Sequence, residues 1–307
     1  MKVGIVGAGA VGSACLLSLA LRGAAREIVL VNRNPKRAEG VVTDAQYGAV
    51  LAPSVNLRAG DFDDLRGAAL VMITAGINEK TGGATDRNDP KGRLRLFETN
   101  AEIYHELVPA IAKAAPEALI LAVTDPPDPL ADVAGQIVGH DRVLSTGTYL
   151  DSLRFRFHLG QKLQVNPASI DAMVLGEHGI SQVFVWSSVR VSGVPLSTIL
   201  GEDAQALERL RNEVEREVRY ANITIIEGTG ASVYGIGVVS ARIAEIIVRD
   251  ERVVIPIGAF HTRYGTTLSL PSVLGREGVL RVLEPEMSQQ EQRLLEQSAR
   301  TLREIAA

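Results

Sequence analysis

The chain has 307 residues and a net charge of −4 at pH 7, with 46% of its residues hydrophobic and 22% charged. A chain of this length forms one large domain or two ordinary ones, and its apolar share is sufficient for a sizeable core. No block rich in lysine and arginine is present, so nucleic acid is excluded as an expected partner. No window offers about 18 uninterrupted apolar residues, so no membrane partner is expected either.

The first half of the chain alternates short apolar, β-branched runs with helical stretches. Met1 leads directly into the run KVGIVGA without the regions of a signal peptide, so we expect a soluble cytoplasmic protein. Further strands are expected in EIVLVN, VNLRAG, ALVMITAG, ALILAVTD and RVLSTGT, with helices at 12–22 and 100–115. Buried strands that alternate with helices predict an α/β fold, in which helices cover both faces of a parallel sheet.

The only cysteine, Cys15, lies in the apolar run SACLLSLAL shortly after the first strand. A single cysteine excludes an intramolecular disulfide and suits a reducing compartment. A cysteine in such apolar surroundings packs as a small hydrophobic residue, so we predict a packing role for it.

A glycine-rich turn, G-x-G-x-x-G, connects the first strand to the first helix. It contains Gly7, Gly9 and Gly12, with Ala10 and Val11 before the last glycine. Two of the glycines let the backbone approach a pyrophosphate, the third allows close packing of helix on strand, and the helix N-terminus provides N–H donors. The motif alone is weak evidence, but its place between a strand and a helix predicts a doubly wound Rossmann fold that binds a dinucleotide.

The end of the second strand bears on the choice between NAD and NADP. An acidic residue is expected there to bind the ribose hydroxyls of NAD, but the sequence has Asn32 followed by Arg33. Loss of the carboxylate removes repulsion against a 2′-phosphate, and the arginine adds a partner for it. Alternatively, Asn32 still binds the ribose of NAD and Arg33 is solvated, so both cofactors remain open.

After about residue 148 the sequence pattern changes. A long polar helix is expected at 202–226, antiparallel strands in QVFVWSSVRVSG and RVVIPIGAF, and a closing helix at 288–305 that begins with the capping box SQQE. We therefore predict two domains. A dinucleotide-binding Rossmann domain at 1–145 is followed by an α+β catalytic domain at 146–307.

Three polar residues of the second half form a candidate catalytic group. His178 lies between glycines in VLGEHGIS, while Asp151 and Arg154 lie three residues apart in STGTYLDSLRFRF, on one face of an expected helix. A carboxylate bonded to an imidazole fixes its tautomer and stabilises the imidazolium, which can then protonate a carbonyl oxygen. A neighbouring arginine can bind a substrate carboxylate through its planar fork.

The motifs GAGAVG, TAG at 74–76, YLDSLRFR, LGEHG and GTGASVYGIG at 228–237 together resemble those of the lactate/malate dehydrogenase family. The resemblance covers essentially the full chain, and LGEHG followed by WSS is closest to the L-lactate and L-2-hydroxyisocaproate branch. It implies an enzyme that transfers a hydride reversibly between NAD or NADP and a 2-oxo or 2-hydroxy monocarboxylic acid. His178 would be the proton donor and acceptor, Asp151 its orienting partner, and Arg154 the clamp for the substrate carboxylate.

The same resemblance implies roles for further residues. Arg93, seven residues before Asn100, matches the loop arginine that polarises the substrate carbonyl, whereas Arg87 and Arg95 fit that spacing less well. Ser232 matches a small or hydroxylated residue on the pocket wall. Besides the glycine turn, the cofactor-binding positions would be Thr74, Ala75, Gly76, Asn100 and Val123.

One departure from the family pattern lies in the segment AVTDPPDPL. The family has Asn-Pro where this chain has Asp125-Pro126, and that asparagine normally binds the substrate oxygen or helps to hold the nicotinamide end. An ionised Asp125 can only accept hydrogen bonds and would repel a developing alkoxide. It is therefore protonated, paired with a charged His178, turned away, or a cap of the turn. We expect Asp125→Asn to preserve or improve turnover of a pyruvate-type substrate.

A second departure is the segment before Arg93, which is about eight residues longer than is typical of the lactate branch. The specificity position of the family falls at Glu79, whose charge would disfavour a second substrate carboxylate if it points inward. Lys80, Arg87 or Lys91 could take its place and favour an acidic substrate. We interpret the segment as a closing lid, enlarged as in the 2-hydroxyisocaproate branch, which suggests a bulky 2-oxo acid.

Two alternatives to a lactate-type enzyme remain open at this point: a malate dehydrogenase, and a dinucleotide-binding sensor without catalysis. Members of the family are usually homodimers or homotetramers, and the expected helices at 202–226 and 238–249 could supply interfaces. No metal site is expected.

Overall fold

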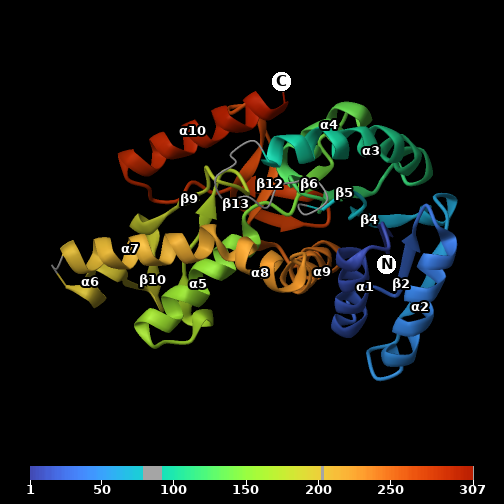
Figure 1. Ribbon diagram of the computed structural model, residues 1–307, viewed down its shortest axis with the longest axis horizontal. Coiled ribbons are helices and arrows are strands. Elements are labelled where there is room, and N and C mark those ends of the chain that lie inside the picture. Colours follow the sequence, from blue (N-terminus) through green and yellow to red (C-terminus); the bar gives the residue numbers. More distant parts are fainter. Residues whose placement is uncertain (79–91, 202–203, 307) are drawn as a thin grey trace.

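The computed structural model describes residues 1–78, 92–201 and 204–306, and only the backbone of 92–95, 204 and 306. A nine-stranded sheet runs through the described part in the order β14-β13-β12-β6-β5-β4-β1-β2-β3 (Figure 1). Its six N-terminal strands are parallel. They are β1 (Lys2–Val6), β2 (Glu27–Val31), β3 (Asn56–Gly60), β4 (Ala68–Ile73), β5 (Leu119–Ala122) and β6 (Val143–Ser145). Each predicted strand of the first half is confirmed.

Helices cover both faces of this sheet, as predicted. One face packs against α1 (Ala10–Arg22), α2 (Pro35–Ala49) and α9 (Tyr234–Arg249), and the other against α3 (Gly92–Ala114) and α4 (Pro127–Val138). Both faces of the parallel strands inside the sheet are buried, which explains their nearly continuous apolar sequences, whereas the edge strand β3 is partly exposed. The chain therefore has the predicted α/β Rossmann architecture.

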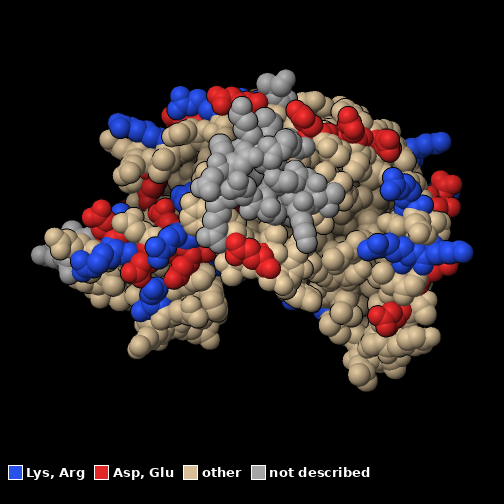
Figure 2. Space-filling model, viewed as in Figure 1, with Lys and Arg blue, Asp and Glu red and all other residues tan. Residues whose placement is uncertain are grey.

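Cys15 on α1 is fully buried, and its burial raises the pKa of the thiol to about 12. The packing role predicted for it is confirmed. No single helix in the described residues is both long and apolar enough to cross a membrane. Basic and acidic side chains are interspersed over the face shown in Figure 2.

The second half of the chain extends the sheet and adds a smaller layer. The strands β12 (Val253–His261), β13 (Thr266–Gly275) and β14 (Gly278–Val282) are antiparallel, and β12 joins the parallel sheet by pairing with β6. The antiparallel strand expected in RVVIPIGAF is thus confirmed. Short strands form two further sheets: β7 (Ile170–Asp171), β10 (Arg190–Val191) and β11 (Val194–Pro195) in one, β8 (Val174–Leu175) and β9 (Val183–Phe184) in the other.

The prediction of one continuous strand in QVFVWSSVRVSG is wrong for the middle of this segment. A 3-10 turn, Trp186–Ser188, separates β9 from β10. The turn places the Trp186 ring against Phe155 with centroids 4.7 Å apart, while the indole Nε1 donates to Glu215 at 2.9 Å. Burial of this large ring therefore overrides the alternating strand pattern. Two other 3-10 turns lie at Asp63–Leu65 and Pro167–Ser169.

The helix expected at 202–226 is also corrected. The structure has two helices, α7 (Ala204–Arg219) and α8 (Ala221–Thr229), which meet at Tyr220 with φ −103° and ψ 5°. α7 packs its apolar stripe, with Val214 and Val218 buried, in the same cluster as α5 (Tyr149–Leu163). After the break, Asn222 on α8 accepts a hydrogen bond from the guanidinium of Arg154. The prediction of one continuous helix does not indicate this contact.

The helices expected at 100–115 and 238–249 both begin earlier than expected, α9 at Tyr234, whereas α10 lies within one residue of expectation. α3 begins at Gly92, eight residues before the expected start, and its early residue Leu96 is fully buried. α6 (Leu196–Leu200) is short, and α10 (Gln289–Ala306) closes the chain. The capping box before α10 is confirmed, since the Glu291 carboxylate accepts from the Ser288 N–H at 2.7 Å and the Ser288 hydroxyl accepts from the Glu291 N–H at 3.3 Å.

Candidate active site

A pocket lies at the carboxyl ends of the central parallel strands, where ligands of doubly wound sheets bind. Both halves of the chain contribute to it. Among the residues proposed from the sequence, its lining includes Gly9, Ala10, Val11, Thr74, Gly76, Val123, Asp125, Arg154, His178 and Ser232. The structure thus brings residues that are far apart in sequence to one cavity.

The glycine turn has the geometry needed for close approach of a phosphate. Gly7 has φ +117°, and a Cβ at Gly12 would overlap the Gly7 carbonyl oxygen, so both positions require glycine. A Cβ at Gly9 would meet no protein atom within 4 Å, since this residue faces the pocket. Gly9 is also the N-cap of α1, so the helix N-terminus opens toward the same space. These residues fit a bound dinucleotide.

Asn32 is part of the wall behind this turn. Its side-chain oxygen accepts from the Ala8 N–H at 3.0 Å, and its amide donates to the Asn34 carbonyl at 3.0 Å. Arg33 beside it is exposed, and Arg37 on α2 donates to the Ala8 carbonyl at 2.7 Å. One arginine, Arg37, therefore contacts the turn, and Asn32 places an amide where a carboxylate would stand.

Three other expected cofactor-binding positions serve mainly to hold the backbone of the pocket. The Thr74 hydroxyl donates to the Gly7 carbonyl at 3.0 Å, and the Ala75 carbonyl accepts from the Thr124 hydroxyl at 2.8 Å. Asn100 is fully buried; its amide donates to the carbonyls of Ile77 and Asp125 and its oxygen accepts from the Ile77 N–H. Asn100 thus lies behind the pocket wall, where it ties the segments after β4 and β5 together.

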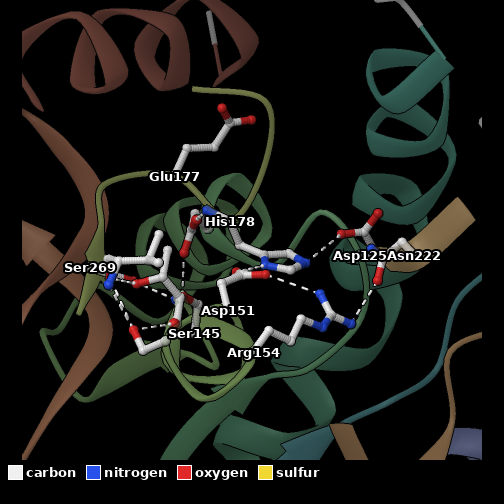
Figure 3. Close-up of polar contacts among 12 residues, drawn as sticks. Asp125, Ser145, Asp151, Arg154, Glu177, His178, Asn222 and Ser269 are labelled. Atoms are coloured by element: carbon white, nitrogen blue, oxygen red, sulfur yellow. Dashed lines mark hydrogen bonds and ion pairs between the residues drawn. The ribbon is translucent and has the colours of Figure 1, made fainter. Parts of the chain in front are cut away.

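His178, Asp151 and Arg154 meet in the pocket (Figure 3). The His178 Nδ1–H donates to Asp151 Oδ2 at 2.5 Å, and Arg154 binds Asp151 Oδ1 at 3.0 Å. Asp151 is buried in the first turn of α5 and Arg154 lies one turn later, which is the shared helix face expected from their spacing. Arg154 is fixed a second time by donating to Asn222 Oδ1 at 2.8 Å. The carboxylate can therefore orient the imidazole and stabilise its charged form.

The backbone of His178 is held by a residue that sequence reasoning missed. The His178 N–H donates to Asp128 Oδ2 at 2.7 Å, and the Ser145 hydroxyl also donates to this carboxylate. Asp128 is buried on α4, and this burial raises its pKa to about 7. The sequence shows only that an acidic residue begins the apolar segment DPLADVAG. It does not indicate that this residue binds the backbone of His178.

We expect Asp128→Asn to change how the stability of the protein depends on pH. Because the pKa of Asp128 rises from 3.8 to about 7 on folding, its protonated form stabilises the fold fully below pH 3.8. That contribution is lost as the pH rises toward 7, so the free energy of unfolding of the original protein should fall relative to that of the variant over this window. Urea unfolding at a series of pH values measures the difference. Asp141→Asn, at an exposed position, provides the control, and parallel profiles for all three proteins would contradict the prediction.

Asp125 stands at the end of β5 on the pocket wall. Its bond to Pro126 is cis, and its carboxylate is 19% exposed, with Oδ1 at 4.0 Å from His178 Nε2. Of the alternatives left open by the sequence, a side chain turned away from the site is excluded by this geometry. Asp125 faces the nitrogen of His178 that Asp151 does not bind.

Two residues expected in the site are not placed. Glu79 lies outside the described residues, as do Lys80, Arg87 and Lys91. Arg93 belongs to the first turn of α3, but its side chain, like that of Arg95, lies outside the described part of the structure.

Comparison with known proteins shows that both halves of the chain are similar to the same family. Residues 1–144 match the lactate/malate dehydrogenase NAD binding domain, and residues 148–307 match the lactate/malate dehydrogenase alpha/beta C-terminal domain. An L-lactate dehydrogenase of Deinococcus radiodurans is 42% identical over 306 residues, which cover 99% of this chain and 97% of the relative. One of Thermus aquaticus is 41% identical over 316 residues, with 100% and 99% covered. The solved minor L-lactate dehydrogenase from Enterococcus mundtii, in its ligands-bound form, is 31% identical with a TM-score of 0.91 and covers 99% of this chain and 97% of its own.

Proposed function

The chain belongs to the lactate/malate dehydrogenase family, and on that premise we propose that it is an L-2-hydroxy acid dehydrogenase of lactate type. It is an L-lactate dehydrogenase-like oxidoreductase that acts on CH–OH donors, and we propose 2-oxo and 2-hydroxy monocarboxylic acids as its substrates. The observation that carries this proposal is the contact of His178 with Asp151 beside Arg154, in the same pocket as the glycine turn.

The proposed mechanism assigns a separate task to each polar group. The glycine turn and the N-terminus of α1 would hold the pyrophosphate of the dinucleotide, whose nicotinamide would supply the hydride for reduction of C2 or accept it during oxidation. His178 donates its proton from Nε2 to the carbonyl oxygen during reduction and recovers it during oxidation, while Asp151 keeps Nδ1 protonated. Arg154 binds the substrate carboxylate, and its contacts with Asp151 and Asn222 fix the plane of the guanidinium.

The expected roles of the unplaced residues stay part of this proposal. From its match to the loop arginine of the family pattern, Arg93 is proposed to polarise the substrate carbonyl and, with the closing lid, to exclude water. Glu79 is proposed as the specificity position, which would disfavour a second carboxylate on the substrate. Ser232, on the pocket wall, would contact the substrate, and the longer segment before Arg93 suggests a bulky 2-oxo acid.

A substrate panel tests the function. Steady-state reduction of pyruvate, 2-oxoisocaproate, phenylpyruvate and oxaloacetate should show a preference for the monocarboxylic acids, assayed with NADH and with NADPH. A clear preference for oxaloacetate would identify a malate dehydrogenase instead. Tight binding of the nucleotide without turnover of any 2-oxo acid would favour a sensor that has lost catalysis.

The N-terminal domain of the family binds NAD, and we propose that this chain also accepts NADP. Support comes from Asn32, whose oxygen is used by the Ala8 N–H and whose amide has replaced the carboxylate that would repel a 2′-phosphate. Arg33 follows Asn32 in the chain and is exposed, and Arg37 donates to the Ala8 carbonyl of the turn. In the alternative, NAD alone is used, Asn32 binds its ribose and Arg33 is solvated.

We expect Asn32→Asp to move the cofactor preference toward NADH. The new carboxylate would accept from the ribose hydroxyls of NADH and repel the phosphate of NADPH, so the NADH/NADPH ratio of kcat/KM should rise about 10- to 100-fold. Dissociation constants for the two nucleotides, measured by fluorescence, should shift in the same direction. Asn56→Asp, which adds an equal charge at an exposed position on β3, is the control. An unchanged ratio would show that Asn32 does not select the cofactor.

We also propose a separate role for each of the two domains and an oligomeric state for the protein. Residues 1–145 would bind the dinucleotide and residues 146–307 would carry the substrate and proton-transfer groups. A homodimer or homotetramer is proposed because large apolar side chains are exposed at the end of α2 and around α8 and α9: Tyr47, Val50, Leu51, Tyr220, Tyr234 and Val238. A cytoplasmic location without nucleic-acid or membrane partners remains the expectation from the sequence.

A further inference from the structure

The two ring nitrogens of His178 face two different carboxylates. Asp151 binds Nδ1 at 2.5 Å from inside the protein, whereas Asp125 lies 4.0 Å from Nε2 on the pocket side (Figure 3). The side chain of Asp151 is 2% exposed and that of Asp125 is 19% exposed. Nε2 is therefore the nitrogen available for exchange with a substrate, and Asp125 stands next to that exchange.

The position of Asp125 is well defined by its neighbours. Its carbonyl accepts from the buried amide of Asn100 at 2.8 Å, and the same amide group holds the backbone of Ile77. Its carboxylate lines the pocket together with His178 and Arg154. Movement of the Asp125 backbone out of the site would therefore disturb the junction between the segments that follow β4 and β5.

The substrate atom that exchanges a proton with His178 must lie within hydrogen-bond reach of Nε2, and hence close to the Asp125 carboxylate. An ionised carboxylate can only accept hydrogen bonds. A ketone oxygen also only accepts, and it becomes negative during reduction, so the contact is repulsive. An iminium nitrogen carries positive charge and, when it bears a hydrogen, donates, so the same contact is attractive.

We propose that Asp125 is a specificity-determining residue that lets this site reduce iminium derivatives of 2-oxo acids, formed with ammonia or a small primary amine, to 2-amino acids. This activity rests on the proposed function, since Arg154 binds the substrate carboxylate and a reduced nicotinamide is consumed in both reactions. The 2-oxo acid and the amine condense in solution with loss of water. A hydride then adds to C2, the π electrons of the C=N bond become the lone pair on nitrogen, and the amine takes one proton from His178.

The test compares the purified protein with Asp125→Asn, which places an amide at this position. NADH or NADPH oxidation is followed with pyruvate alone and with pyruvate plus methylamine, and N-methylalanine is measured by mass spectrometry. We expect methylamine to increase the rate for the original protein. In Asp125→Asn the ratio of amine-dependent to ketone turnover should fall about 10- to 100-fold.

A binding measurement separates this role from a general effect on the fold. In the presence of the oxidised nucleotide, N-methyl-L-alanine should bind more tightly than L-lactate to the original protein, and the order should reverse in Asp125→Asn. Asp171→Asn, an exposed aspartate on β7, is the control for loss of one charge and should behave as the original protein does.

Turnover of pyruvate without any amine dependence, or an unchanged ratio in Asp125→Asn, would overturn this inference and leave the proposed function standing. Absence of turnover on all 2-oxo acids and their iminium forms, in both proteins, would contradict both proposals.

Discussion

Replacement of His178 by alanine should lower kcat for 2-oxo acid reduction by about 10²- to 10⁴-fold, the usual range for loss of a general acid. Nε2 of this residue faces the pocket, and no other imidazole lines it among the described residues. The variant keeps Arg154, so substrate binding should suffer less than turnover. Steady-state kinetics over the substrate panel measure both parameters.

The controls separate chemistry from folding. His105→Ala removes an exposed imidazole on α3 and should leave kcat unchanged. Nucleotide binding to His178→Ala should also be preserved, because the glycine turn is built by other elements. Nearly full kcat in His178→Ala would refute its assignment as the proton donor.

The substitution Asp151→Asn is a second test of the assignment of His178 as the proton donor. The amide has the same shape, but it cannot stabilise the imidazolium and can bind Nδ1 through its donor as well as its oxygen. A loss of kcat that approaches that of His178→Ala would show that the two side chains act as one unit.

Much of the fold follows from local sequence patterns. The five parallel strands inside the sheet, β1, β2, β4, β5 and β6, are mostly apolar because both of their faces are covered. The glycine turn is recognisable because close backbone contacts at Gly7 and Gly12 exclude any side chain. The attachment of β12 to β6 was not predictable in this way. Antiparallel strands look alike whether they form their own sheet or extend another, and the pairing partner is set by contacts distant in sequence.

In the candidate site, too, local sequence patterns predicted some features, whereas contacts between distant residues were not predictable. Asp151 and Arg154 share a helix face because of their spacing, but their meeting with His178 rested on the family resemblance. Asp128 and Asn222 were missed because each contacts its partner across a distance of 50 or more residues, and no local period encodes such a contact. The break at Tyr220, which positions Asn222, lies in a helical pattern that continues through it.

Replacement of Arg154 by leucine should raise KM for 2-oxo acids by about 10²- to 10³-fold, with a smaller loss in kcat. Charge-assisted bonds to a carboxylate contribute about 1.5–3 kcal/mol each, and a guanidinium can make two of them at once. Leucine fills part of the space but offers no donor. Initial rates at rising pyruvate concentration separate the two parameters.

Arg154→Lys tests whether charge alone is sufficient. A lysine keeps the positive charge but cannot hold Asp151, Asn222 and a substrate carboxylate in one plane, because its ammonium is not a fork. Its KM should therefore lie between those of the original protein and Arg154→Leu. Arg281→Leu, at an exposed position on β14, is the control.

The contrast between the two parameters decides the role of Arg154. A carboxylate clamp binds the ground state and the transition state alike, so its loss appears mainly in KM. If Arg154→Leu lowered kcat and left KM unchanged, the residue would act through its contact with Asp151, as a support for His178. The substrate carboxylate would then have to bind elsewhere, and the preference for 2-oxo acids would need another explanation.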